Sequence, residues 1–148
     1  MGVRSVFHAI ENRYSPLLSL SGKAIARRLI RQLIQAILLE KINDQKLFII
    51  ANHFISKLGG SPSDAQRVKQ AQIVNEFVAQ LLQVDPQANV IVLGDLNDLP
   101  DSLPLKTLEG NILENLTVRL PLSDQFSFKF RGNPELIDHL LDARIRLA

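Results

Sequence analysis

The chain has 148 residues, of which 46% are hydrophobic and 22% are charged. This length suits one globular domain that buries about 68–70% of its unfolded surface, and the composition excludes collagen-like, coiled-coil and intrinsically disordered chains. Seventeen Lys and Arg against fifteen Asp and Glu give a net charge of +2, so charge alone does not predict a nucleic-acid partner. The absence of cysteine excludes disulfides and thiolate chemistry.

The N-terminal region carries no visible signal peptide, because His8, Glu11 and Arg13 interrupt the apolar stretch that such a signal needs. No apolar run approaches the roughly 18 residues that would suggest a membrane span. We therefore expect a cytoplasmic location by default and no membrane span. Residues 1–33 are expected to be an irregular or helical N-terminal segment, and residues 34–148 to form a partial domain.

The stretch before residue 43 allows two structures. Residues 23–42 have helix propensity, with apolar residues at helical spacing. They also carry a basic cluster that consists of Lys23, Arg27, Arg28 and Arg31. We interpret this cluster as a solvated helix face, and the alternative is contact with nucleic acid or anionic lipid. Residues 43–45 have turn chemistry, however, and residues 46–51 form a compact apolar run. Residues 35–42 are therefore equally compatible with the first arm of a hairpin.

The middle of the chain predicts a strand, a helix and a second strand. Ser63 followed by Gln66 has the form of a capping box, and a helix over residues 63–83 would place on one face Val68, Ala71, Val74, Val78 and Leu81. Residues 90–93 form a buried strand that stops at Gly94. A right-handed crossover would make this strand parallel to residues 46–51. The residues after both strands should then meet at one sheet edge, with side chains within roughly 10 Å.

The last third predicts shorter elements. A short helix is expected near residues 103–108, ending at Gly110, and an edge strand over residues 112–118. Residues 126–130 and 136–141 are expected to form a hairpin with its turn at residues 132–134 and Asp138 inside the second arm. The three Phe of the first arm are expected to pack in a sheet rather than to stack on bases.

Polar groups that can bind metal or phosphate follow both predicted parallel strands, where α/β proteins place their ligands. Alone, Asp95 and Asn97 would be turn formers, His53 a hydrogen-bonded histidine at a strand end, and Asp138 a charge facing water. Their sequence context favours a functional site for His53, Asp95 and Asn97 and leaves both interpretations of Asp138 open. The relevant segments are Asn-His-Phe-Ile-Ser-Lys at 52–57, Gly-Asp-Leu-Asn-Asp at 94–98 and Ile-Asp-His-Leu-Leu at 137–141.

These three segments, in this order, resemble the motifs of the endonuclease/exonuclease/phosphatase superfamily, which includes pancreatic deoxyribonuclease, sphingomyelinases and inositol-phosphate phosphatases. The resemblance implies an α/β fold, here a partial deoxyribonuclease-like four-layer sandwich with a mixed sheet and flanking helices. It also implies metal-dependent hydrolysis of a phosphodiester or phosphomonoester. The substrate class, with nucleic acid as one candidate, is not specified by these motifs.

The resemblance implies a role for each matched residue. Asp95 would bind Mg²⁺ or Mn²⁺ and activate a water that Asn97 orients, while His53 would donate a hydrogen bond to a phosphate oxygen. Asp138 matches an Asp that orients a later catalytic His, and Asn52 and Lys57 are expected to contact the substrate. In the predicted strand, His139 would point away from Asp138.

Two family features have no match in this chain, namely the metal-binding Glu of an early strand and a Ser-Asp-His motif after Asp138. We therefore expect a C-terminal-half fragment that is a poor or inactive hydrolase and that self-associates through uncovered sheet surface. The alternative is a non-catalytic remnant that acts as a binding or interaction module.

Overall fold

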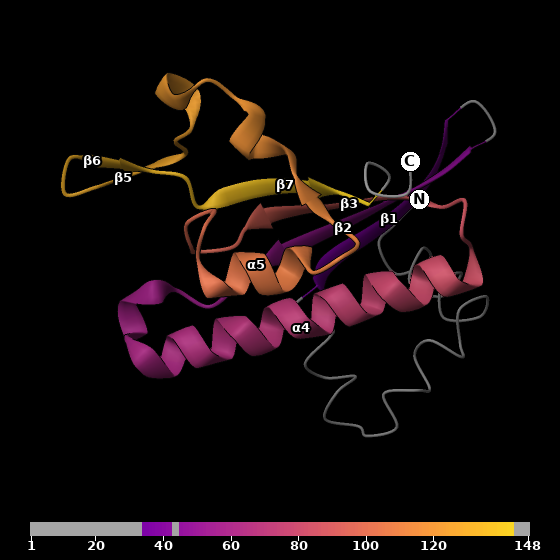
Figure 1. Ribbon diagram of the computed structural model, residues 1–148, viewed down its shortest axis with the longest axis horizontal. Coiled ribbons are helices and arrows are strands. Elements are labelled where there is room, and N and C mark those ends of the chain that lie inside the picture. The colour runs from indigo at the N-terminus through magenta and orange to yellow at the C-terminus, as the bar shows by residue number, and fades with distance from the viewer. Residues whose placement is uncertain (1–33, 43–44, 144–148) are drawn as a thin grey trace.

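The computed structural model describes residues 34–42 and 45–143, and the predictions for residues 1–33 lie outside this part of the chain. Its main feature is a mixed five-stranded sheet with the strand order β1-β2-β3-β7-β4 (Figure 1). The strands are β1 (Ile34–Ile42), β2 (Gln45–His53), β3 (Asn89–Asp95), β4 (Glu114–Asn115) and β7 (Asp138–Asp142). The expected α/β architecture with a mixed sheet and flanking helices is confirmed.

The hairpin alternative for the first strand is confirmed. β1 pairs antiparallel with β2 along nearly its whole length, from Ile42 opposite Gln45 to Ile34 opposite Asn52. Helix propensity is a weak preference, and pairing with a strand inside a larger sheet overrides it. The helix alternative is therefore wrong for residues 34–42.

The predicted crossover is also confirmed. β2 and β3 are parallel neighbours, and helix α4 (Ser61–Val84) connects them. The helix begins two residues before the predicted Ser63, and its N-cap residue, Gly60, makes no side-chain capping bond, so the capping-box prediction is wrong. Pro62 explains the earlier start, because the first turn of a helix tolerates proline without losing a hydrogen bond.

Helix α4 and the short helix α5 (Leu103–Glu109) cover one face of the sheet (Figure 1). The core between these helices and the sheet contains Phe48, Ile50, Val90, Val92 and Leu141 from the sheet, and Ala71, Val74, Val78, Leu81, Leu105 and Leu108 from the helices. Burial of each larger side chain contributes about 1.5–3 kcal/mol. On the opposite face the alternating residues are only half-buried, namely Leu47, Ile49, Ile91, Leu93 and Leu140. We call this second surface the half-buried face.

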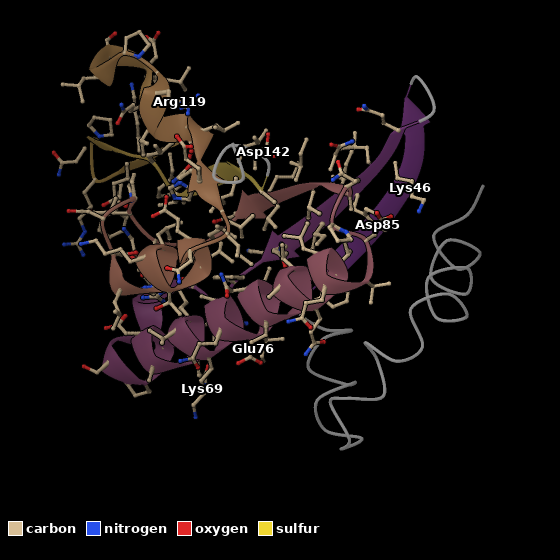
Figure 2. The ribbon with its side chains drawn as sticks, turned by 45° about the vertical axis from the view of Figure 1, so that its right-hand side comes forward. Lys46, Lys69, Glu76, Asp85, Arg119 and Asp142 are labelled. Atoms are coloured by element: carbon tan, nitrogen blue, oxygen red, sulfur yellow. The ribbon has the colours of Figure 1, made fainter. Side chains whose placement is uncertain are left out.

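Charged residues mark the outside of this arrangement. Lys69 and Glu76 lie on the surface of α4 that faces away from the sheet (Figure 2). Lys46 and Asp85 form a 2.7 Å ion pair that joins the start of β2 to the end of α4. Within the described residues, no helix is both long and apolar enough to cross a membrane.

The predicted edge strand over residues 112–118 is mostly wrong. Only Glu114 and Asn115 pair, with β7, and the chain then enters the 3₁₀ helix η2 (Leu116–Arg119). The Asn115 side chain accepts a hydrogen bond from the Thr117 backbone N–H, and such a local bond diverts the backbone from a strand. The predicted helix ending at Gly110 is confirmed.

The predicted C-terminal hairpin divides into two parts. β5 (Phe128–Phe130) pairs with β6 (Asn133–Glu135) through a turn at Arg131 and Gly132, whose φ values of 49° and 86° match the type I′ hairpin turn. The turn therefore lies one residue earlier than predicted. Asp138 does not lie in the hairpin, because β7 has left it and joined the main sheet.

The expectation that the three Phe pack in a sheet is wrong for two of them. Phe126 is 47% exposed and Phe128 is 46% exposed. The small β5–β6 sheet has only two strands, so it offers no covered face for these rings.

Gly94 predicts a large effect of a small substitution. Its φ is 134°, and a Cβ at this position would lie 2.0 Å from the backbone oxygen of Asn52 on the neighbouring strand. Gly94→Ala should therefore lower the free energy of unfolding by about 2–4 kcal/mol, since backbone strain and overpacking each cost about 1–3 kcal/mol. Urea denaturation would measure this. Gly60→Ala is the control, because no atom lies within 4 Å of its Cβ position, and it should cost about 1 kcal/mol. Equal losses in the two variants would contradict the prediction.

Candidate active site

Three polar residues form a row across the ends of β2, β3 and β7. His53 pairs with Asp95, and Asp95 pairs with Asp138. Residues paired across strands point to the same face of a sheet, so all three side chains project from one face at one edge. His53 Nε2 lies 3.7 Å from Asp95 Oδ2, and these side chains are 54% and 36% exposed. We call His53, Asp95 and Asp138 the strand-end row. The predicted meeting of His53 and Asp95 at one edge is confirmed.

Asn97 lies beside the strand-end row and holds the loops after β2 and β3 together. Its φ of 53° is left-handed, a conformation that Asn tolerates better than most residues. Its backbone N–H donates to Asp95 Oδ1 at 3.0 Å, and its side-chain Nδ2 donates to the Phe54 carbonyl at 2.9 Å. Asp95 is thereby held through one carboxylate oxygen, while the other faces His53.

Asn52 and Lys57 lie apart from this group. Asn52 alternates with His53 along β2, so its side chain enters the helix-covered face, where it is 3% exposed and donates to the Ile50 carbonyl. The Lys57 ammonium pairs with Glu135 of β6. The structure thus brings together His53, Asp95, Asn97 and Asp138, whereas Asn52 contacts the Ile50 carbonyl and Lys57 contacts Glu135.

A divalent cation such as Mg²⁺ prefers several oxygen ligands, of which one or two are usually carboxylates. The strand-end row offers the neighbouring carboxylates of Asp95 and Asp138. In the part of the chain that the structure describes, no group of three or more His, Cys, Asp or Glu side chains is placed to hold a metal. These residues therefore do not complete a metal site by themselves.

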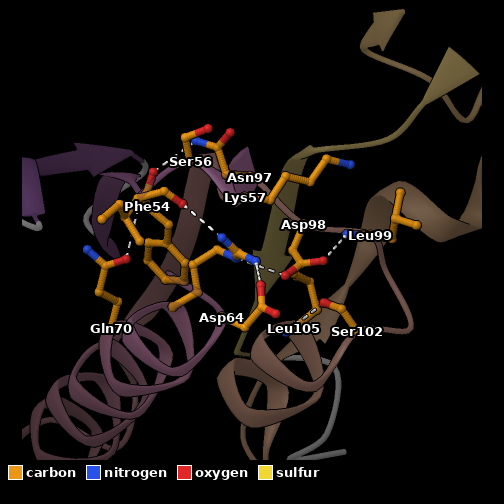
Figure 3. A network of polar contacts seen from close by, with 12 residues as sticks. Phe54, Ser56, Lys57, Asp64, Gln70, Asn97, Asp98, Leu99, Ser102 and Leu105 are labelled. Carbon is orange, nitrogen blue, oxygen red and sulfur yellow. Dashed lines mark hydrogen bonds and ion pairs between the residues drawn. The ribbon is translucent and has the colours of Figure 1, made fainter. Parts of the chain in front are cut away.

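A buried arginine lies behind the site, and the sequence pattern did not identify it. Arg67 of α4 is 2% exposed, and Nε donates to Asp98 Oδ2 at 2.9 Å (Figure 3). The helical periodicity predicted that Val68 faces the core at this point of α4. Arg67 takes that position instead, and Val68 is only half-buried. The available signal was its spacing, because Arg67 stands four and seven residues before the buried Ala71 and Val74.

His139 connects the same loop to the edge of the sheet. Its ring is buried on the face opposite Asp138, as the strand alternation predicted. Nε2 donates to the Asp98 carbonyl at 2.8 Å, and Nδ1 accepts from the Asn115 amide at 3.0 Å. Because a carbonyl only accepts hydrogen bonds, these partners assign a neutral ring with its hydrogen on Nε2. Burial lowers the pKa of His139 below 6.5, opposed by the Asp98 carbonyl and by nearby carboxylates.

This lowered pKa predicts a pH dependence of stability. The unfolded chain binds a proton at His139 near pH 6.5, whereas the folded chain resists protonation until a lower pH. The free energy of unfolding should therefore decrease as the pH falls below 6.5, by at most about 1.4 kcal/mol per pH unit from this group, and level off below the folded-state pKa. Urea titrations between pH 5 and pH 8 would measure the slope. His139→Gln should flatten the slope, and an unchanged slope in this variant would contradict the assignment.

The β5–β6 hairpin is fixed next to the strand-end row. Ser127 Oγ accepts hydrogen bonds from the backbone N–H groups of Ile137 and Asp138, at 3.2 and 3.1 Å. Together with the ion pair between Lys57 and Glu135, these bonds join the hairpin to both sides of the site. The base of the hairpin is therefore attached to the chain beside Asp138.

Comparison with protein-family models gives a match to the "Endonuclease/Exonuclease/phosphatase family" over residues 18–144. No curated protein matches the chain. The solved structures that it resembles share low sequence identity with it. Truncated TDP2 of Caenorhabditis elegans has a TM-score of 0.58 and 20% identity, over 72% of this chain and 44% of that one.

Two further structures show the same fold. The mannosyl-6-phosphatase Bt3783 of Bacteroides thetaiotaomicron VPI-5482 has a TM-score of 0.53 and 16% identity, over 70% of this chain and 39% of that chain. The F277A, P278A mutant of beta toxin from Staphylococcus aureus, with bound magnesium ions, has a TM-score of 0.50 and 14% identity, over 73% and 41%. The present chain thus corresponds to less than half the length of each of these proteins.

Proposed function

Since the chain belongs to the endonuclease/exonuclease/phosphatase family, whose members are metal-dependent phosphoesterases, we propose that it acts on a phosphodiester or phosphomonoester. The observation that carries this proposal is the strand-end row beside Asn97. A histidine, a carboxylate and an amide converge there at an exposed sheet edge, 3.7 Å apart in the case of His53 and Asp95. These are the groups that phosphate-ester hydrolysis requires.

Each residue of the site has a distinct task in this proposal. A water attacks phosphorus, and the Asp95 carboxylate accepts its proton as the new P–O bond forms. The ester P–O bond on the opposite side breaks at the same time, and the leaving oxygen takes a proton from solvent and departs as the alcohol. Asn97 orients this water, and the His53 imidazole donates a hydrogen bond to a phosphate oxygen whose negative charge grows in the transition state. Asp138, next to Asp95 in the row, acts as a positioning residue. Asn52 is buried on the helix-covered face of the sheet and donates to the Ile50 carbonyl of its own strand, so this proposal gives it no contact with substrate.

We further propose that the reaction depends on Mg²⁺ or Mn²⁺, which Asp95 would help to hold. When bound, such an ion supplies positive charge to the phosphate oxygens. The donor set among the described residues is incomplete, which supports slow turnover by this chain alone. The half-buried face supports self-association, which size-exclusion chromatography would detect.

A binding role without catalysis is the second candidate, favoured by the same incomplete donor set. In that case the strand-end row would still bind inorganic phosphate, and His53→Ala would weaken this binding. NMR titration with phosphate would detect it. Binding without turnover at any metal concentration would select this candidate over the enzyme.

The test of the proposed enzyme is a single-turnover assay with the chain in excess over substrate. Bis(p-nitrophenyl) phosphate and plasmid DNA are incubated with Mg²⁺, Mn²⁺ or a chelator. We expect slow, metal-stimulated hydrolysis that falls at least about 100-fold in Asp95→Asn, because this variant loses the carboxylate base. The matched control is Asp101→Asn, an exposed carboxylate near the end of the same loop, which should behave as wild type. Hydrolysis that persists in Asp95→Asn, or is insensitive to chelation, would exclude the proposed role.

A further inference from the structure

Arg67 is among the largest fully buried side chains of the described residues, and a charged group in this position requires an explanation. The helices could pack on the sheet with an apolar residue here, as Ala71 and Val74 do one and two turns later. Burying a guanidinium costs several kcal/mol before its hydrogen bonds offset the loss of water. The identity of its partners indicates what this residue contributes.

The partners of Arg67 come from both loops that carry the candidate site and from α4, and Figure 3 labels two of these partners, Asp98 and Asp64. Nε donates to Asp98 Oδ2 at 2.9 Å, on the loop after β3, and one terminal nitrogen donates to the Ile55 carbonyl at 3.3 Å, on the loop after β2. The other terminal nitrogen pairs with Asp64 of the same helix. Asp98 directly follows Asn97, and Ile55 lies two residues after His53.

Two further bonds fix the same loops. The Ile55 N–H donates to Gln70 Oε1 at 2.9 Å, so α4 holds both backbone groups of this residue. Asn97 joins the two loops directly through its bond to the Phe54 carbonyl at 2.9 Å. Helix α4 and the two loops thus form a closed ring of hydrogen bonds behind the strand-end row. The planar guanidinium sets this geometry in a way that the point charge of a lysine would not.

From this ring we propose that Arg67 is a positioning residue, which sets the separation of His53 from Asp95 and Asn97 by holding both loops against α4. The inference rests on the proposed function, because it assigns the residue to the geometry of that site. Rates of positioned reactions are sensitive to small displacements, so a shift of about 1 Å can cost about 100-fold. Arg67 touches neither substrate nor reacting atoms.

The experiment compares Arg67→Lys with Asp64→Asn. Arg67→Lys keeps the positive charge but cannot donate to both loops at once. Asp64→Asn alters the one partner of Arg67 that lies on α4 itself and is exposed, so both loops should stay in place. Urea denaturation of each variant identifies the conditions in which it is folded, and all comparisons are made there.

Two measurements decide the proposal. Amide NMR spectra should show shifts at Ile55, Asn97 and His53 in Arg67→Lys, and none of that size in Asp64→Asn. In the single-turnover assay, the rate constant of Arg67→Lys should fall at least 10-fold at an unchanged substrate dissociation constant. A merely structural role would instead lower the reacting fraction and leave the rate constant unaltered.

Each outcome bears on the proposal. Unchanged loop resonances in folded Arg67→Lys, or equal effects in both variants, would overturn it. If wild-type protein shows no turnover, the proposed enzyme fails and the NMR comparison alone decides whether Arg67 positions the loops. If wild type turns over and Arg67→Lys has the same rate constant, the positioning role fails while the proposed function stands.

Discussion

Replacing Asp98 by Ala should lower the free energy of unfolding by about 3–5 kcal/mol, because it removes the more buried of the two carboxylates that pair with the buried guanidinium of Arg67. Arg67 is 2% exposed and loses the acceptor of its Nε hydrogen. The backbone N–H of Leu99 loses its acceptor, Asp98 Oδ1, as well. Such a loss would be a large fraction of the total stability of a small domain, which is about 5–15 kcal/mol.

Urea denaturation would measure the effect, with two variants as references. Asp98→Asn keeps a hydrogen-bond acceptor for Arg67 and should cost clearly less than Asp98→Ala. Asp64→Ala removes a partner whose side chain is 60% exposed, so the expected loss is within about 1 kcal/mol. If Asp98→Ala and Asp64→Ala were equally destabilised, the pair between Arg67 and Asp98 would not contribute more to stability than the pair between Arg67 and Asp64.

Replacing His53 by Ala should have the opposite profile, with a large effect on hydrolysis and almost none on stability. General-acid and hydrogen-bonding groups contribute typically about 10²–10⁴-fold to the rate, so single-turnover hydrolysis should fall at least about 100-fold. The side chain is 54% exposed, and exposed substitutions usually change stability by within about 0.5 kcal/mol.

The control for His53 is Lys57→Met, which removes a charge from the same loop after β2. Lys57 pairs with Glu135 and does not lie in the strand-end row, so its loss should change the rate much less. Melting curves of both variants would establish that they are folded. A rate in His53→Ala within a few-fold of wild type would remove this residue from the proposed chemistry.

The strand, helix and strand that create the site could be predicted because each has a strong local signal. Apolar runs in β2 and β3 and the periodicity of α4 required no knowledge of tertiary contacts, and the crossover rule then placed His53 and Asp95 together. The first strand is different. Residues 34–42 satisfy the helical pattern as well as the extended one, so only the family resemblance favoured the strand that forms.

The parts that could not be predicted depend on contacts between distant residues. A periodic analysis treats arginine as a surface residue, so it passed over Arg67 and assigned its position to Val68. Asp138 was placed in a hairpin because the sequence between β6 and β7 shows no break. Its membership of the main sheet follows from pairing with Asp95, which a local pattern does not contain.

The parallel pairing of β2 and β3 also determines the order in which the molecule can be built. β1 and β2 are joined by a short connection and can pair early, whereas His53 and Asp95 become neighbours only after the intervening chain, with the 24 residues of α4, has closed into a loop. Closing that loop costs conformational entropy before the stabilising contacts between the strands have formed, and this cost slows folding. The strand-end row is therefore among the last features to form. A partly folded chain has the hairpin but not the strand-end row, so the phosphate binding that we propose for this row should return during refolding with the final, slowest kinetic phase.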